Sequence, residues 1–464
     1  MSIFTATMQV DLSYEQFQSL VHNGLAGLPT ERTAKACDIA LGVIVEGPRV
    51  TLFSSAYGGR TLAAHSLMAD ETMAVKGSGG VVIDANLFIK TVRPKVGSSY
   101  TIFSKSKTEF TLCPPLVKGF DAARMRMRIY TAMESSPSDS DGQLHLYCEL
   151  YDPSPNARQY MLTSGYACAP LEEYSFLGSA ECVLSVKSSA LKSHIERIGG
   201  LLKRRGSTVE FGMDRGCYKM IIRNGGLIST IELLPGEYEA RRESIWVSFD
   251  AKEILKVAAG DLGADIQICQ LADSPNSDGR VRFICSSKLY ECGGVWGCEP
   301  SEKHRQKSAA RNTIPVSLDR DKLLQSVELF RVAKIDKIRL RLHHQVSLLT
   351  IMPGSPRPKK QLSSMACSLP CYLPPLRKGL SYWCVNGVNL LRVLRSMTGD
   401  RVRIILADNE IILLDSDNPF VSHRLACLQP DGLGEEVEKK LLSMEADMVK
   451  QAERQFTGWH PAGD

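Results

Sequence analysis

Short runs in which apolar and polar residues alternate are followed repeatedly by stretches with apolar residues three and four positions apart. Alternation with a period of two is typical of a half-buried strand, and the wider spacing is typical of an amphipathic helix. The clearest case is a predicted strand at 180–186 followed by a predicted helix over 188–205. The apolar face of that helix is formed by Leu191, Ile195, Ile198, Leu201 and Leu202.

The remaining predicted elements repeat the same order. Three strands at 209–213, 218–223 and 228–234 are separated by turns, the second of them at Asn224-Gly225-Gly226. A further strand and a second helix, 251–260, come next, before three closing strands. Polar residues suited to cap a helix N-terminus precede four of the predicted helices: Ser13, Asp250, Asp319 and Asn386.

This order of elements occurs three times along the chain, which predicts an α+β protein of three repeated domains. In each repeat, two helices pack on antiparallel sheet. The first copy also carries an insertion at about 94–123. The predicted domains are 1–176, 179–300 and 313–430, followed by a C-terminal helical tail, 431–464.

Composition changes this picture little. The chain has 464 residues, of which 44% are apolar and 23% charged, with a formal net charge of +5. These values are typical of globular proteins, and no run reaches the ~18 apolar residues of a membrane span. The first residues show no charged and then apolar leader, and the 14 Cys are scattered. We therefore expect a cytoplasmic protein with unpaired thiols and no membrane partner.

Motifs for catalysis are missing from the sequence. It contains no P-loop, dinucleotide-binding glycine turn, His-Glu-x-x-His or Gly-x-Ser-x-Gly, which argues against an enzyme. Cys292 and Cys298, or Cys367 and Cys371, do not form the paired knuckles of a zinc site, so neither a metal nor another cofactor is expected. The two adjacent histidines at 343–344 fall at a strand end and are interpreted as a surface pair.

Three stretches resemble the bacterial-type DNA sliding clamp, the β subunit of DNA polymerase III. They are Tyr166-Ala-Cys-Ala-Pro-Leu-Glu-Glu-Tyr-Ser-Phe176, Ile245-Trp-Val-Ser-Phe-Asp-Ala-Lys-Glu-Ile-Leu255, and Val385-Asn-Gly-Val-Asn-Leu-Leu-Arg-Val-Leu394 with Asp400-Arg-Val-Arg-Ile-Ile-Leu406. The likeness covers residues 4–430. It implies three clamp domains per chain and a head-to-tail homodimer ring with helices lining the hole. Enclosing a double helix takes about six such units, which agrees with two chains of three.

The resemblance implies four kinds of partner: double-stranded DNA, a replicative DNA polymerase, a clamp loader and other proteins that carry a clamp-binding motif. A sliding ring needs diffuse positive charge on its inner helices. The cations at these positions are Lys90, Arg93, Lys192, Arg197, Lys203, Arg204, Arg205, Lys252, Lys256, Lys322, Arg392 and Arg395. The alternative is that they belong to ordinary solvated helix faces.

The resemblance also places a client-peptide pocket between the second and third repeats. Its apolar walls would be Leu227, Ile228, Leu425, Cys427 and Leu428. The alternative is that these are core residues of a final strand. Two departures from the family stand out: its Thr-Asp-Gly-His-Arg-Leu turn is replaced by Asn224-Gly-Gly-Leu-Ile228, and the chain continues beyond Pro430, where the family ends. A divergent or virus-encoded clamp would carry such departures.

Two other functions stay open at this point. A clamp-like structural or adaptor protein that is not loaded on DNA would share the repeats. A sequence-specific DNA binder is less favoured because the sequence shows no recognition-helix module or zinc finger. A clamp would act in the cytoplasm, associated with the nucleoid.

Overall fold

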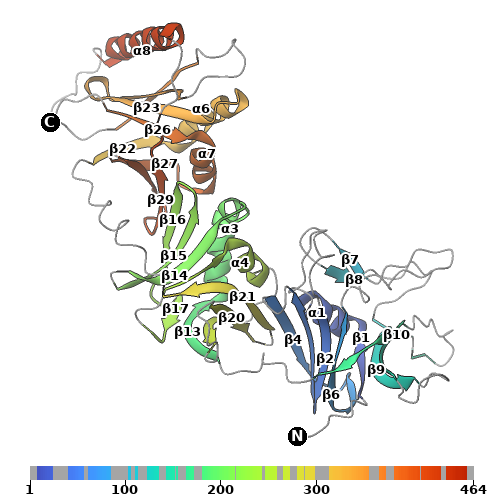
Figure 1. Cartoon of the computed structure of the whole chain (residues 1–464). Coiled ribbons are helices and arrows are strands. Elements are labelled where there is room, and N and C mark those ends of the chain that lie inside the picture. Colours follow the sequence, from blue (N-terminus) through green and yellow to red (C-terminus); the bar gives the residue numbers. More distant parts are fainter. Residues whose placement is uncertain are drawn as a thin grey trace, which may run out of the picture. The chain divides into compact units, whose positions relative to one another are not determined.

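A computed structural model of the chain provides the fold (Figure 1). The residues it describes are 8–24, 40–56, 61–84, 103–105, 110–112, 123–134, 143–151, 153–154, 164–171, 180–214, 216–242, 246–258, 265–271, 279–286, 288–297, 313–354, 365–372, 381–407, 409–429 and 435–456. The chain divides into two compact units. One comprises Met1–Ser189, Glu239–Arg242 and Lys256–Trp296, and the other Ala190–Tyr238, Glu243–Leu255 and Gly297–Asp464.

The structure is a mixed α+β protein in which the strands far outnumber the helices. The described helices are α1 (Tyr14–Gly24), α3 (Ser188–Leu202), α4 (Ala251–Ala258), α6 (Arg320–Val332), α7 (Gly387–Ser396), α8 (Glu435–Phe456) and a short 3₁₀ helix, η4 (His344–Val346). The strands of the first repeat are β1 (Met8–Ser13), β2 (Ala40–Glu46), β3 (Arg49–Ala56), β4 (Thr61–Met68), β5 (Ala74–Gly77), β6 (Gly79–Asp84), β7 (Phe103–Lys105), β8 (Phe110–Leu112), β9 (Arg126–Glu134), β10 (Gln143–Tyr151), β11 (Ser164–Ala167) and β12 (Ala169–Pro170).

The two later repeats have the following strands. In the second they are β13 (Ala180–Lys187), β14 (Thr208–Asp214), β15 (Cys217–Asn224), β16 (Leu227–Glu232), β17 (Tyr238–Ala240), β18 (Val247–Asp250), β19 (Asp265–Leu271), β20 (Arg280–Cys285) and β21 (Lys288–Trp296). In the third they are β22 (Ile314–Asp319), β23 (Lys337–His343), β24 (Leu348–Pro353), β25 (Cys367–Pro370), β26 (Ser381–Asn386), β27 (Arg401–Leu406), β28 (Glu410–Asp415) and β29 (Val421–Ala426).

Strand pairing follows one scheme in all three repeats. The strand that opens a repeat pairs with the first of its three closing strands, and these pair in series: β1–β9–β10–β11, β13–β19–β20–β21 and β22–β27–β28–β29. The strands between the two helix positions form a second series: β6–β2–β3–β4, β18–β14–β15–β16 and β26–β23–β24–β25. All these pairs are antiparallel, so the predicted α+β repeats are confirmed.

Sheets also join from one repeat to the next. Strand β4 of the first repeat pairs with β21, the last strand of the second. In the same way, β16 of the second repeat pairs with β29, the last strand of the third. The two junctions therefore use equivalent strands.

Local sequence signals set the helix ends. Oγ of Ser13 accepts a hydrogen bond from the backbone amide of Gln16, and Oε1 of Gln16 accepts one from the backbone amide of Ser13. Asp250 caps α4 by accepting a bond from the amide of Lys252. Asp319 and Asn386 accept bonds from the third residue of their helices. These four predicted caps are confirmed. The helix predicted over 188–205 instead ends at Leu202, where a turn leads to Gly206 at φ +76°.

Two further features complete the fold. In the insertion at 94–123, the structure describes a small β7–β8 hairpin and the residue Ala123. The segments between the predicted domains, 177–178 and 301–312, lie outside the described residues. Beyond the third repeat, α8 lies across one face of the sheet that contains β23 and β24 (Figure 1).

Candidate nucleic-acid interface and client-peptide site

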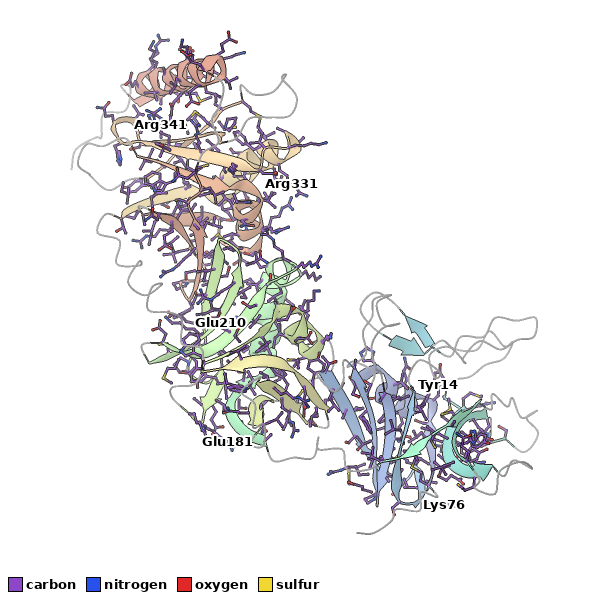
Figure 2. All side chains as sticks on the ribbon, viewed as in Figure 1. Tyr14, Lys76, Glu181, Glu210, Arg331 and Arg341 are labelled. Atoms are coloured by element: carbon purple, nitrogen blue, oxygen red, sulfur yellow. The ribbon has the colours of Figure 1, made fainter. Side chains whose placement is uncertain are left out.

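Two helices and the turn after a third bring three arginines near one another in the second unit. Arg204 follows α3, Arg331 lies in the last turn of α6 (Figure 2), and Arg392 lies on α7. The pKa of Arg392 is held below its usual value, first by partial burial and then by the positive charges of Arg204 and Arg331. Three neighbouring guanidinium groups repel one another, and an anion bound among them would relieve that repulsion.

The position of Arg204 is fixed by α7. Its Nη1 donates to Oδ1 of Asn389 at 2.5 Å, and Asn389 is buried in the first turn of the helix that carries Arg392. The packing of α6 against α7 brings the helix that carries Arg331 beside the helix that carries Arg392. Within the described part of the chain, none of the three arginines forms an ion pair with a carboxylate.

The other predicted cations differ in whether their charge is free to bind an anion. Lys192, Lys203, Arg205, Lys252 and Lys322 are exposed or half-buried and have no acidic partner among the described residues. Arg395 pairs with Glu328 at 2.5 Å on the surface, so much of its charge is already balanced. Lys256 donates to the hydroxyl of Tyr290 at 3.1 Å.

Three more predicted contacts are Arg197, Lys90 and Arg93. One nitrogen of Arg197 is buried, so only part of its guanidinium can reach a ligand. Lys90 and Arg93 lie outside the described residues. Arg331 was not predicted as a contact, although Lys322 on the same helix was, and its neighbours in the cluster come from other segments of the chain.

The two segments predicted to form a client pocket lie side by side. Leu227 pairs with Leu425, and Ile228 pairs with Arg424, in the β16–β29 ladder. Beyond the end of β29, the chain stays attached to the third repeat through backbone bonds. The amides of the next two residues, Cys427 and Leu428, donate to carbonyl oxygens at 2.8 and 2.7 Å. The second junction therefore holds all five predicted wall residues.

Burial separates these residues into two groups. Leu227 and Leu425 are buried and belong to the packing of the junction, whereas Ile228, Cys427 and Leu428 are half-buried. The half-buried side chains are therefore the ones that remain available to a bound peptide. The pocket itself stays a prediction.

A buried histidine lies in the same junction and was not predicted. Nδ1 of His423 lies 2.8 Å from Oγ of Ser229, and both side chains are completely buried. Burial lowers the pKa of His423 to about 4, although Asp415 acts in the opposite direction. The ring is therefore neutral at neutral pH and joins β16 to β29 as an uncharged hydrogen-bonding group.

The predicted surface pair at 343–344 is partly wrong. His343 is only slightly exposed, and its Nε2 lies 2.9 Å from Oε1 of Glu445 on α8. The reason is that α8 covers the strand end, which the local sequence does not reveal. No three His, Cys, Asp or Glu side chains come together as a metal site in the described ranges. Among the described helices, none is both long and apolar enough to cross a membrane.

Solved structures share this arrangement of strands and helices. A Caulobacter crescentus DNA polymerase sliding clamp matches with a TM-score of 0.62 and 14% identity over 91% of this chain and all of its own. A Pseudomonas aeruginosa sliding clamp gives 0.61 and 15%, covering 91% of this chain and 99% of its own. A C. crescentus β clamp with polyethylene glycol at a candidate β-motif tethering region gives 0.60 and 14%, with the same two coverages.

This chain has the sliding-clamp fold. The match extends over nearly the whole length of each solved clamp, so all three repeats take part in it. No protein-family model matches the sequence, and no curated protein matches it either. The sliding-clamp fold is thus carried here by a sequence that differs from the solved clamps at most positions.

Proposed function

We propose that this protein is a DNA polymerase processivity factor: a ring of two chains that encircles duplex DNA without reading its sequence. It tethers a replicative polymerase, a clamp loader and other proteins with clamp-binding motifs, and it catalyses no reaction. It acts in the cytoplasm, on the nucleoid. The observation that carries this proposal is the Arg204, Arg331 and Arg392 cluster on a chain with the sliding-clamp fold.

The strand junctions support a closed head-to-tail ring. Each junction inside the chain pairs the last strand of the series between the helix positions, β4 or β16, with the last closing strand of the next repeat, β21 or β29. The two equivalent strands left over are β25 and β11, and each lies at the edge of its sheet. Pairing β25 of one chain with β11 of a second copy repeats the same junction, and a head-to-tail contact of this kind closes into a ring when the rotation permits.

The cluster supports binding to the phosphate backbone. Its three guanidinium groups come from α6, α7 and the turn after α3, so no single helix presents all three of them to a DNA groove. Phosphate contacts of this kind hold DNA without sequence information and allow a protein to slide. The exposed Lys203, Arg205 and Lys322 would extend this surface.

The client site rests on the half-buried residues of the second junction. Ile228, Cys427 and Leu428 offer apolar contacts beside a paired strand, where a short peptide could anchor hydrophobic side chains. The solved C. crescentus clamp with a candidate β-motif tethering region supports a peptide site in this fold.

DNA binding can be tested by charge reversal within the cluster. The double variant Arg204→Glu/Arg392→Glu is compared with Arg395→Glu, because Arg395 is already paired with Glu328. We expect the double variant to bind unrelated duplexes at least tenfold more weakly and its salt slope to fall by about 0.9 for each lost phosphate contact. Arg395→Glu should change affinity much less. Fluorescence anisotropy over a salt series measures both quantities.

The ring is tested separately by the mass in solution. Light scattering should give about twice the chain mass of 51.1 kDa at micromolar concentration. A stable monomer would contradict the ring. A dimer whose affinity for DNA does not respond to the double variant would instead support a clamp-like adaptor that is not loaded on DNA.

A further inference from the structure

Helix α8 is fixed to the third repeat by a buried acid. The Glu445 carboxylate is 3% exposed and bonds Arg341 at 2.5 Å, His343 at 2.9 Å and the hydroxyl of Thr350 at 2.8 Å. Arg341 lies on the strand beneath the helix (Figure 2). These bonds lower the pKa of Glu445 despite the opposing effect of burial. Leu441 and Ala452 are also buried, so α8 is a docked part of the fold.

A groove of about 470 Å³ lies between α8 and the edge strand β25. Leu348, Ser368 and Pro370 line it from the sheet, and Met448, Gln451 and Gln455 line it from the helix. None of these six side chains is charged. The outward side of the same helix carries Lys439, Lys450 and Glu453, all exposed.

This distribution of charge distinguishes the groove side of α8 from the outward side. The groove side presents the thioether of Met448 and the amides of Gln451 and Gln455. The centres of protein interfaces are likewise poor in charged residues and rich in Met. The outward side has the charges of a solvated surface. A partner that covers the groove therefore meets an uncharged wall beside the open strand edge.

The strand that would pair with β25 is β11 of a second copy, and it borders a sheet face with small and aromatic residues. Gly165 and Ala167 of β11 lie opposite Tyr147 and His145 of β10, on one face of their sheet. The Tyr147 ring stacks on Tyr130 with centroids 5.0 Å apart, so two aromatic rings lie on this face, near the ion pair of Arg128 and Asp11. A neighbouring helix can approach Ala167 closely, because its side chain takes up little space.

The strands alone would give a short ladder. Both β25 and β11 have four residues, and Pro370 has no amide proton to donate. The junctions inside the chain have ladders of similar size: β4 and β21 share four residue pairs, and β16 and β29 share five. Contact between α8 and the face of the partner's sheet would add apolar area to a ladder of this size.

We propose that α8 is part of the contact between two copies of this chain, with its groove covering the β10–β11 edge of the second copy. This inference rests on the proposed ring, and it assigns a role to a segment beyond the three repeats. Met448, Gln451 and Gln455 form the wall that meets the second copy.

Matched charge variants on α8 test this role. Gln451→Glu/Gln455→Glu adds two negative charges to the groove wall, and Lys450→Glu makes the same change in net charge on the outward side. We expect the double variant to weaken dimerisation at least tenfold and Lys450→Glu to change it less than twofold. Sedimentation over a concentration series measures the dissociation constant, and circular dichroism checks that both variants keep the helix.

Cross-linking tests the same contact by position. A photo-cross-linking residue at position 455 should join two full chains, and mass spectrometry should map the cross-link to β10 or β11 of the second copy. The same residue at position 450 should give no such product. A wild-type dimer that is indifferent to the double variant, or a cross-link elsewhere, overturns the role of α8 alone. A wild-type monomer overturns the ring as well.

Discussion

The β4–β21 and β16–β29 junctions use equivalent strands but bury different chemistry. Beside β4, the guanidinium of Arg282 lies 2.6 Å from the carboxylate of Glu291, and both side chains are almost fully buried. Between β16 and β29, a neutral His423 bonds to Ser229. The first junction therefore depends on two charges balancing each other, and the second depends on a ring staying uncharged. The same pairing scheme can be stabilised in ways that respond differently to mutation and to pH.

The largest expected effect is the loss of one member of the ion pair. Arg282→Met leaves the Glu291 carboxylate buried without its partner, which should cost about 3–5 kcal/mol of unfolding free energy. Urea denaturation measures the loss, and hydrogen exchange should show it at β20 and β21. The double variant Arg282→Met/Glu291→Leu should recover most of the stability. Equal stability of the single and double variants would contradict this view.

Acidification should destabilise the β16–β29 junction. The pKa of His423 in the folded protein, about 4, is below its ordinary value of 6.5, so the unfolded chain binds more protons between these two values. Stability from this residue is complete above pH 6.5 and is lost as the pH falls towards 4, by roughly 3 kcal/mol in all. Denaturation at pH 7 and pH 5 measures the change.

The variant His423→Gln serves as the control for this pH dependence. It should be less stable at pH 7 but should lose less on acidification, because the titrating ring is gone. An unchanged difference between pH 7 and pH 5 in the variant would show that another group is responsible.

A smaller effect is expected from the hydroxyl that bonds this histidine. Ser229→Ala removes the partner of Nδ1 and should cost about 1–2 kcal/mol, since a buried polar atom is left without its bond. Ser229→Thr keeps a hydroxyl at this position and separates the loss of the bond from a change of packing. Thermal denaturation at pH 7 provides the comparison, and a full-sized loss in the threonine variant would assign the effect to packing.

Sequence patterns predicted the local parts of this fold well. The caps at Ser13, Asp250, Asp319 and Asn386 act within one helical turn, so the residues that determine them are neighbours in the chain. The hairpin turn that follows Asn224 is equally local, and Gly225 takes φ +56° to make it. The order of elements and the threefold repeat follow from such signals.

Contacts between residues far apart in the chain could not be predicted from local sequence patterns. Arg204, Arg331 and Arg392 are near one another only because α6, α7 and the turn after α3 come together in the fold, and these segments are far apart in sequence. The bond between Ser229 and His423 joins residues 194 positions apart. That Leu227 and Ile228 lie near Leu425, Cys427 and Leu428 was expected from the family resemblance and not from any pattern in the residues. The docking of α8 over His343 was expected from neither.

The edge positions of β25 and β11 have a mechanical consequence for a ring built as proposed. Because these two strands would belong to different chains, no peptide bond links the two sides of the seam, and the ring parts there most readily. Neither chain has to unfold for this to happen, because each edge strand stays paired to its own sheet. Such a seam would let a loading machine open one gap, thread the DNA and allow the same surfaces to meet again.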